Sequence, residues 1–165
     1  MAKGVVEKQY WDACLFLDLV NETKGRAEKL AAMLDALKTD GGVVAYTSML
    51  TITEAAGIKD ADDKIRVPPK KVIAAIDHFW SVESPIRLVE LYQTVAHEAR
   101  GLMREAAREK FSLKPHDAIH FATASRVGAS RFFTYDQGLF KYNERWGFTV
   151  GEPSSEQLPF EGAAD

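Results

Sequence analysis

Short apolar runs alternate with amphipathic helical patterns along most of this chain, and the alternation restricts the folds that it can adopt. Strands are expected at residues 8–11, 43–47, 86–91, 131–134 and 148–150. Helices are expected at residues 24–38, from about residue 51, and at residues 68–80, 94–110, 115–126 and 137–145. Strands that alternate with helices predict an α/β sandwich with a mostly parallel central sheet.

Two of the helical segments carry specific signals. Residues 94–110 form the clearest helix, with apolar residues on one face and Arg100, Arg104 and Arg108 at intervals of four on the other. Pro115 opens a helix that is apolar on most sides, which predicts a central position in the fold.

The length and the charge distribution indicate one folded domain and a separate acidic segment at its C-terminal end. A length of 165 residues suits one domain. The net charge is -3, but residues 151–165 carry four acidic residues and no basic one. Without those four charges the rest of the chain is about +1, so a nucleic-acid partner is not excluded. We expect residues 1–150 to form the folded domain and residues 151–165 to form a loosely held acidic tail.

Cysteine content and hydropathy exclude several classes of protein. Cys14 is the only cysteine, which rules out an internal disulfide and a zinc site built of thiolates. No apolar stretch is long enough to span a bilayer. The apolar run at residues 13–20 contains Asp18 and lacks the basic lead of a signal peptide. A cytoplasmic protein without membrane attachment is therefore expected.

Four acidic residues fall where a parallel sheet gathers its ligands. Asp12, Glu54 and Asp136 lie at expected strand ends or in the helices that follow, and Asp117 lies in the first turn of the apolar helix. Because the carboxyl ends of parallel strands meet at one edge, these acids are expected to cluster. Each also has a structural explanation. Glu54 fits a capping box with Thr51, where a helix would begin, and the aspartates suit helix N-termini.

The sequences around these acids form a known pattern. They are YWDACLFL around Asp12, TITEAA around Glu54, KPHDAIHFATA around Asp117 and FFTYD ending at Asp136. In order and context they resemble the PIN-domain family, in particular its VapC-type toxin ribonucleases. The match around Asp117 is the most specific, and the resemblance covers nearly all of the chain before the acidic tail. Residues 58–84 form a longer segment than is usual in the family's small toxins.

The resemblance implies a three-layer α/β/α sandwich that hydrolyses RNA with metal-activated water and leaves a 5′-phosphate. The four carboxylates would be both the catalytic residues and the ligands of Mg²⁺ or Mn²⁺. Oxygen ligands suit these cations, and carboxylates that share a pocket repel one another unless cations neutralise them. Thr134 and His120 are expected to lie beside the ligands. A toxin of this kind forms homodimers and is held inactive by a small antitoxin.

Basic and aromatic residues supply candidates for contact with RNA. Basic residues on two expected helices are candidates for contact with the RNA backbone, namely Arg100, Arg104, Arg108, Lys70 and Lys71. Aromatic residues beside the acids either stack on bases or belong to the core, and these are Tyr10, Trp11 and Tyr135.

Two other functions fit parts of the sequence. His116 and His120 stand one helical turn apart with Asp117 between them, a pattern like the zinc-protease HExxH motif. A zinc hydrolase would need a third ligand, and neither His78 nor His97 has a spacing that marks it as one. The second alternative is a non-catalytic PIN-like module that binds RNA or a protein. Such a module would have no use for mutually repelling acids.

Overall fold

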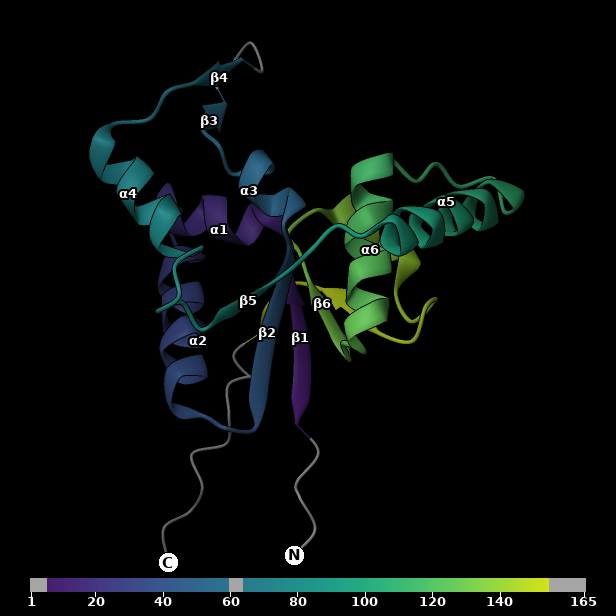
Figure 1. Cartoon of the computed structure of the whole chain (residues 1–165), viewed down its shortest axis with the longest axis horizontal. Coiled ribbons are helices and arrows are strands. Elements are labelled where there is room, and N and C mark those ends of the chain that lie inside the picture. Colours follow the sequence, from purple (N-terminus) through teal and green to yellow (C-terminus); the bar gives the residue numbers. More distant parts are fainter. Residues whose placement is uncertain (1–5, 60–63, 155–165) are drawn as a thin grey trace, which may run out of the picture.

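The computed structural model describes residues 6–59 and 64–154, and helices separate the strands of its main sheet as the sequence predicts (Figure 1). The strands of the main sheet are β1 (Glu7–Trp11), β2 (Val43–Ser48), β5 (Ile86–Val89), β6 (Arg131–Phe133) and β7 (Thr149–Gly151). The helices are α1 (Ala13–Val20), α2 (Ala27–Thr39), α3 (Leu50–Glu54), α4 (Lys70–His78), α5 (Gln93–Arg108), α6 (Pro115–Val127) and the 3₁₀ helix η1 (Gln137–Tyr142). Two further strands, β3 (Ile58–Lys59) and β4 (Ile65–Arg66), form a separate antiparallel pair.

The main sheet has five strands in the order β5-β2-β1-β6-β7, and every neighbouring pair is parallel. The prediction of a mostly parallel sheet is therefore confirmed. β1 lies at the centre, where Tyr10 pairs with Tyr46 of β2 on one side and with Phe132 of β6 on the other. Because all the strands run the same way, their carboxyl ends meet at one edge, which is the upper edge in Figure 1.

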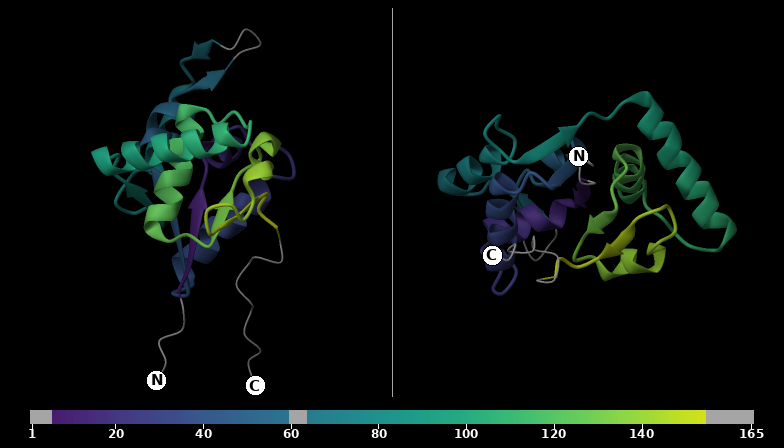
Figure 2. Two further views of the ribbon diagram at one scale, coloured as in Figure 1. Left: turned by 90° about the vertical axis from the view of Figure 1, so that its right-hand side faces the viewer. Right: turned by 90° about the horizontal axis from the view of Figure 1, so that it is seen from below.

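Helices cover both faces of the sheet, which gives a three-layer α/β/α sandwich (Figure 1, Figure 2). Successive side chains of β1 point to opposite faces. Tyr10 stacks on Phe132 and faces the layer of α5 and α6. Trp11 faces the layer of α1 and α2 and packs near Phe16 of α1. Each of these side chains is almost fully buried, and burying one large apolar side chain contributes about 1.5–3 kcal/mol.

Helix α6 is central to its layer, as its apolar sequence predicts. Ala118, Phe121 and Ala122 are buried where α6 packs against the sheet and α5. Gly128 ends the helix with φ of 68°, a left-handed conformation that glycine adopts without strain. The chain then enters β6 at the opposite edge. The first turn of α6, with Asp117, therefore lies at the edge where the strands end (Figure 1).

The capping-box prediction for α3 is wrong. The N-cap of this helix is Met49, which makes no side-chain cap hydrogen bond. The Thr51 hydroxyl instead lies 2.8 Å from the Thr47 hydroxyl, and the Glu54 carboxylate contacts His120. Both side chains of the expected box therefore have partners in other elements, which the local sequence pattern does not reveal.

The segment at residues 58–84 contains the β3–β4 pair, which the sequence patterns did not predict, and helix α4. Residues 60–63 lie outside the described residues. Pro69 occupies the N-cap of α4, close to the position expected for a proline that introduces a helix. The segment expected as a short helix at residues 137–145 is the 3₁₀ helix η1.

The described part of the C-terminus is held against the domain. β7 runs to Gly151, whose carbonyl accepts a hydrogen bond from the Thr134 amide at 3.0 Å. The Lys29 ammonium donates to the Pro153 carbonyl at 3.2 Å. The expected acidic tail thus starts at the last residue of the sheet, and residues 155–165 lie outside the described residues. No helix in the described ranges has the length and apolarity needed to cross a membrane.

Candidate functional site

The carboxyl-end edge of the sheet gathers Asp12, Glu54, Asp117 and Asp136 into one region. Asp12 directly follows β1, and Asp136 follows β6 after a short connection. Glu54 is the last residue of α3, which follows β2, and Asp117 lies in the first turn of α6. Contacts of His120 with Asp12 and Glu54, and the effect of the charges of Asp12 and Asp136 on Asp117, support the expected clustering at this edge.

Thr134 connects two of the acids. Its hydroxyl donates to Oδ2 of Asp12 at 2.7 Å and accepts a hydrogen bond from the Asp136 amide at 3.0 Å. Thr134 is fully buried, and the side chain of Asp12 is only 13% exposed. The other oxygen of Asp12 accepts from the Ala13 amide at 2.8 Å, so Asp12 also caps α1. The Asp12 carboxylate is therefore fixed through both of its oxygens.

His120 connects Glu54 to Asp12. Its Nε2 atom lies 2.6 Å from Oε2 of Glu54 and 3.8 Å from Oδ1 of Asp12. Burial lowers the pKa of His120, but the hydrogen bond to Glu54 and the charges of Asp12, Glu54 and Asp117 raise it by more, so the net pKa is raised. The imidazole therefore supplies a donor among carboxylates that otherwise repel one another.

The other ring nitrogen of His120 faces Tyr10. Tyr10 Oη lies 2.7 Å from His120 Nδ1 and accepts a hydrogen bond from the Ser48 amide at 2.9 Å. Tyr10 is fully buried, and burial together with the charge of Asp12 raises the pKa of its hydroxyl well above the ordinary value. The phenol therefore keeps its proton and remains a hydrogen-bond donor.

Asp117 experiences the negative charge of its neighbours. Burial raises its pKa, His116 opposes the shift, and Asp12 and Asp136 raise it further. Asp136 also acts as the N-cap of η1, because its Oδ1 accepts a hydrogen bond from the Gly138 amide at 2.8 Å. The capping role expected for this aspartate and its place among the acids are thus compatible.

The donor chemistry of these acids can be tested against Mg²⁺ and Mn²⁺. The four carboxylates offer only oxygen, the donor that these cations prefer. The side chains of Asp12 and Asp117 are only 13% and 14% exposed, so water screens their repulsion poorly. Within residues 6–59 and 64–154, however, no three His, Cys, Asp or Glu side chains already form a coordination shell. The oxygen donors and the negative charge of the four acids suit such a cation, but their carboxylates are not arranged as a complete coordination shell.

The geometry does not favour the zinc alternative. Both ring nitrogens of His120 have partners, namely Tyr10 and Glu54. His116 is half exposed, and its Nε2 atom lies 3.4 Å from Oδ1 of Asp117. The two imidazoles therefore occupy different environments, and His120 would have to give up a hydrogen bond to bind zinc.

The aromatic residues beside the acids belong mainly to the core. Tyr10 and Trp11 have no exposed surface, so neither can stack on RNA bases. Tyr135 is half-buried, and the Arg26 guanidinium lies 4.0 Å from its ring centroid. Arg26 also pairs with Asp18 at 3.1 Å.

The basic candidates for RNA contact are exposed but are carried by different helices. Arg100, Arg104 and Arg108 lie on α5, and Lys70 and Lys71 open α4. The two helices lie on opposite sides of the molecule (Figure 1).

The sequence did not predict the link of Tyr10 to His120 or the position of Cys14. Sγ of Cys14 lies 3.5 Å from both Oδ2 of Asp12 and Oγ1 of Thr134, and it accepts a hydrogen bond from the Tyr135 amide. Burial and the charge of Asp12 raise the pKa of the Cys14 thiol to about 12. Cys14 is the second residue of α1, next to the N-cap Asp12, and this position is the sequence signal that would place the two side chains together. The partner of Tyr10 has no local signal.

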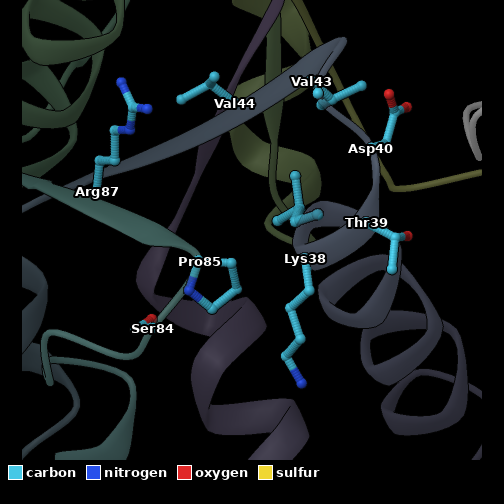
Figure 3. Close-up of a pocket in the computed structure, with 10 residues that line it drawn as sticks. Lys38, Thr39, Asp40, Val43, Val44, Ser84, Pro85 and Arg87 are labelled. Atoms are coloured by element: carbon cyan, nitrogen blue, oxygen red, sulfur yellow. The ribbon is translucent and has the colours of Figure 1, made fainter.

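A cavity at the other edge of the sheet is separate from these acids. It has a volume of about 480 Å³ and lies where α2 ends and β2 and β5 begin (Figure 3). Lys38, Ser84 and Arg87 contribute polar groups to its lining. The Lys38 ammonium is paired with Asp35 at 2.9 Å. Because the cavity lies at the amino ends of the strands, it is not part of the candidate site.

Comparison with known proteins gives concordant matches. No curated protein sequence matches the chain significantly. The solved structure of VapBC2 from Rickettsia felis, bound to a DNA fragment from their promoter, matches with a TM-score of 0.60 at 10% identity and covers 87% of this chain and 96% of that chain. FitAcB from Neisseria gonorrhoeae matches with a TM-score of 0.61 at 18% identity, and the match covers 88% of this chain and 97% of that chain.

The structure of VapC20 from Mycobacterium tuberculosis, described as a Sarcin-Ricin loop cleaving toxin, matches with a TM-score of 0.56 at 16% identity. It covers 78% of this chain and 90% of that chain. At these identities the structural likeness shows the fold alone. The family model of the PIN domain matches residues 10–144, a range that includes all four acids. The chain therefore belongs to the PIN domain family.

Proposed function

We propose that this PIN domain is a metal-dependent endoribonuclease and the toxin component of a toxin–antitoxin pair. The observation that carries the proposal is the contact of one imidazole, that of His120, with Glu54 and Asp12 at 2.6 and 3.8 Å. It joins acids from two separate elements at the edge where parallel sheets bind ligands. The raised pKa of Asp117 indicates that this acid shares the same negative environment.

In this proposal Asp12, Glu54, Asp117 and Asp136 hold Mg²⁺ or Mn²⁺. When bound, such a cation lowers the pKa of water, polarises a phosphodiester and neutralises charge on the leaving oxygen. Asp12 is oriented before binding, because Thr134 and the Ala13 amide fix its two oxygens. Asp117 and Asp136 add negative charge that favours a cation. The expected products of RNA hydrolysis carry a 5′-phosphate.

The basic residues on α5 and α4 are assigned to the RNA backbone. Arg100, Arg104 and Arg108 present exposed side chains on α5, and Lys70 and Lys71 do so on α4. Contacts of this kind neutralise phosphate charge and make binding depend on salt concentration. They provide affinity without reading a base sequence.

Two partners belong to the proposal. The similar structures of VapBC2 and FitAcB support a small antitoxin protein, and the similarity to VapC20, a Sarcin-Ricin loop cleaving toxin, supports an RNA substrate. We further expect a homodimer and a cytoplasmic location. We assign the nuclease domain to residues 1–150 and leave the acidic segment at residues 151–165 outside the catalytic machinery.

Cleavage of RNA under controlled metal conditions tests this proposal. The purified protein, freed of metal and of any co-purifying partner, is incubated with a mixed RNA pool in EDTA, Mg²⁺, Mn²⁺ or Zn²⁺. Asp117→Asn, purified in the same way, controls for contaminating nuclease. The proposal predicts cleavage that requires Mg²⁺ or Mn²⁺, leaves 5′-phosphate ends and disappears in the variant.

The other outcomes are equally informative. RNA binding that needs no metal, survives Asp117→Asn and is never followed by cleavage would assign the chain to the non-catalytic binding modules. Cleavage that requires Zn²⁺ and is lost in His120→Ala, together with the bound zinc, would assign it to the zinc hydrolases. Either result would contradict the proposed nuclease.

A further inference from the structure

A chain of hydrogen bonds runs from the backbone of β2 to the carboxylate of Glu54. The Ser48 amide lies 2.9 Å from Tyr10 Oη, and Tyr10 Oη lies 2.7 Å from His120 Nδ1. His120 Nε2 lies 2.6 Å from Oε2 of Glu54. The chain crosses β2, β1, α6 and α3, so the position of Glu54 depends on four elements rather than on α3 alone.

The chemistry at both ends fixes the direction of the two outer hydrogen bonds of this chain. The Ser48 amide can only donate, so Tyr10 Oη accepts from it. The Glu54 carboxylate accepts, so Nε2 of His120 carries a proton. Tyr10 and His120 are 0% and 1% exposed, so water cannot replace a missing partner. Leaving one such buried polar group unsatisfied costs about 1–3 kcal/mol.

Glu54 needs external support more than Asp12 does. It is the last residue of α3, a helix of five residues, and its side chain is 25% exposed. Asp12 is shorter and is held through both oxygens by Thr134 and the Ala13 amide. A glutamate has one more rotatable bond than an aspartate and loses more conformational freedom when it is fixed.

We propose that Tyr10 is a positioning residue of the nuclease site, which fixes the His120 ring so that the imidazole holds Glu54 beside Asp12. The inference rests on the proposed function, because it treats Glu54 as a ligand of the cation. Tyr10 is buried, so it touches neither RNA nor the ion and acts only through His120. Groups that orient metal ligands typically change metal affinity by about 10–100-fold when they are removed.

The affinity for Mn²⁺, measured from the electron paramagnetic resonance signal of the free ion, tests this role without requiring catalysis. Tyr10→Phe removes the hydroxyl and retains the ring. Tyr142→Phe is the matched control, because Tyr142 is equally buried and its hydroxyl donates to the Ser112 carbonyl instead. We expect Tyr10→Phe to weaken Mn²⁺ binding by about 10-fold or more, and Tyr142→Phe to leave it within about 2-fold of the wild type.

A double-mutant cycle separates action through His120 from a general loss of packing. His120→Gln keeps a side-chain amide that can donate to Glu54 but removes the ring that Tyr10 holds. The inference predicts that adding Tyr10→Phe to His120→Gln weakens Mn²⁺ binding no further. Fully additive effects, or equal losses in Tyr10→Phe and Tyr142→Phe, would overturn it. In cleavage assays, saturating Mn²⁺ should restore most of the kcat of the Tyr10→Phe variant, and its KM for RNA should equal that of the wild type.

A measurement on the unmodified protein guards against variants that do not fold. Nitrogen-15 NMR of the wild type should show a proton on Nε2 of His120, and an unprotonated Nε2 would overturn the inference. Failure of the proposed function gives a different result. If the wild type binds Mn²⁺ in a Tyr10-dependent way but cleaves no RNA, the positioning role stands and the nuclease proposal fails. Cleavage by the wild type, together with Mn²⁺ binding that does not depend on Tyr10, would have the opposite meaning.

Discussion

Nε2 of His120 lies 2.6 Å from Oε2 of Glu54, and this contact joins the central helix α6 to the short helix α3. The same nitrogen is 3.8 Å from Asp12, so one imidazole reaches acids that follow β1 and β2. A sheet in which all strands are parallel brings these elements to one edge. The contact therefore depends on the tertiary fold and not on any local motif.

Asp117→Asn is expected to stabilise the metal-free protein at neutral pH. Burial and the charges of Asp12 and Asp136 raise the pKa of Asp117, against the opposing effect of His116. A raised pKa means that the ionised carboxylate lowers stability above the folded-state pKa, and that this penalty is absent below the unfolded-state pKa of about 3.9. We expect the free energy of unfolding in EDTA to rise by about 0.5–2 kcal/mol at pH 7.

Urea denaturation at several pH values measures this difference. The gain should shrink toward zero as the pH falls below the ordinary pKa of aspartate, because Asp117 is then neutral like asparagine. Asp18→Asn is the control, since Asp18 pairs with Arg26 and should show no gain. A loss of stability in Asp117→Asn at pH 7, or a gain that does not depend on pH, would contradict the prediction.

Thr134→Val is expected to impair cleavage more than Thr134→Ser. Valine removes the hydroxyl that donates to Asp12 at 2.7 Å and accepts from the Asp136 amide at 3.0 Å, whereas serine retains it. We expect the kcat for RNA cleavage to fall by about 10–100-fold in the valine variant. Stability should fall by about 1–3 kcal/mol, because buried polar groups lose their partner. Equal activities of the two variants would show that the hydroxyl has no role in the site.

Neutralising the arginines of α5 is expected to weaken RNA binding in a salt-dependent manner. The variant replaces Arg100, Arg104 and Arg108 with glutamine. If all three contact phosphates of single-stranded RNA, the slope of log affinity against log salt should decrease in magnitude by about 2.

A matched control removes two basic residues from the opposite edge of the sheet, Lys38 and Arg87, which line the cavity there. This double glutamine variant should leave the salt dependence unchanged. If the arginine variant behaves like this control in filter-binding or anisotropy measurements, α5 is not the RNA surface.

Two glycine substitutions are expected to have opposite effects on stability. Gly128→Ala places a side chain at φ of 68° at the end of α6, which should destabilise the fold by about 1 kcal/mol. Gly101 lies in the exposed part of α5, and a Cβ there meets no atom within 4 Å. Gly101→Ala should therefore stabilise the fold by about 0.5–1 kcal/mol. Thermal denaturation measures both, and a shift of the same sign in the two variants would contradict the prediction.

The strands, the helices and the edge that carries the acids could be predicted because they depend on local patterns. Alternation of apolar runs with helical periods fixes the order of elements, and the parallel sheet then places Asp12 and Asp136 at the same edge. The sequence of α6 is apolar on most sides of the helix, and this similarly predicts its central position. The β3–β4 pair could not be predicted, because strands of two residues are too short to show a period.

The detailed contacts of the site could not be predicted from the sequence. Thr51 and Glu54 form an ideal capping pattern, but Thr51 contacts Thr47 and Glu54 contacts His120. A capping box and the observed contacts would both give the Thr51 and Glu54 side chains hydrogen-bond partners. Which of the two forms depends on how α6 packs on the sheet. The sequence allowed Tyr10 either to stack on RNA bases or to belong to the core, and its complete burial shows that it belongs to the core.

The most direct test of the proposed nuclease compares the rates at which single-residue variants cleave one labelled RNA in saturating Mn²⁺. The variants are Asp12→Asn, Glu54→Gln, Asp117→Asn and Asp136→Asn, with Asp18→Asn as the control for loss of an acid outside the cluster. We predict that each of the four reduces the rate by about 100-fold or more, while the control retains the wild-type rate. If the four variants cleave as fast as the control, or if cleavage persists in EDTA, these carboxylates do not form a metal-dependent nuclease site.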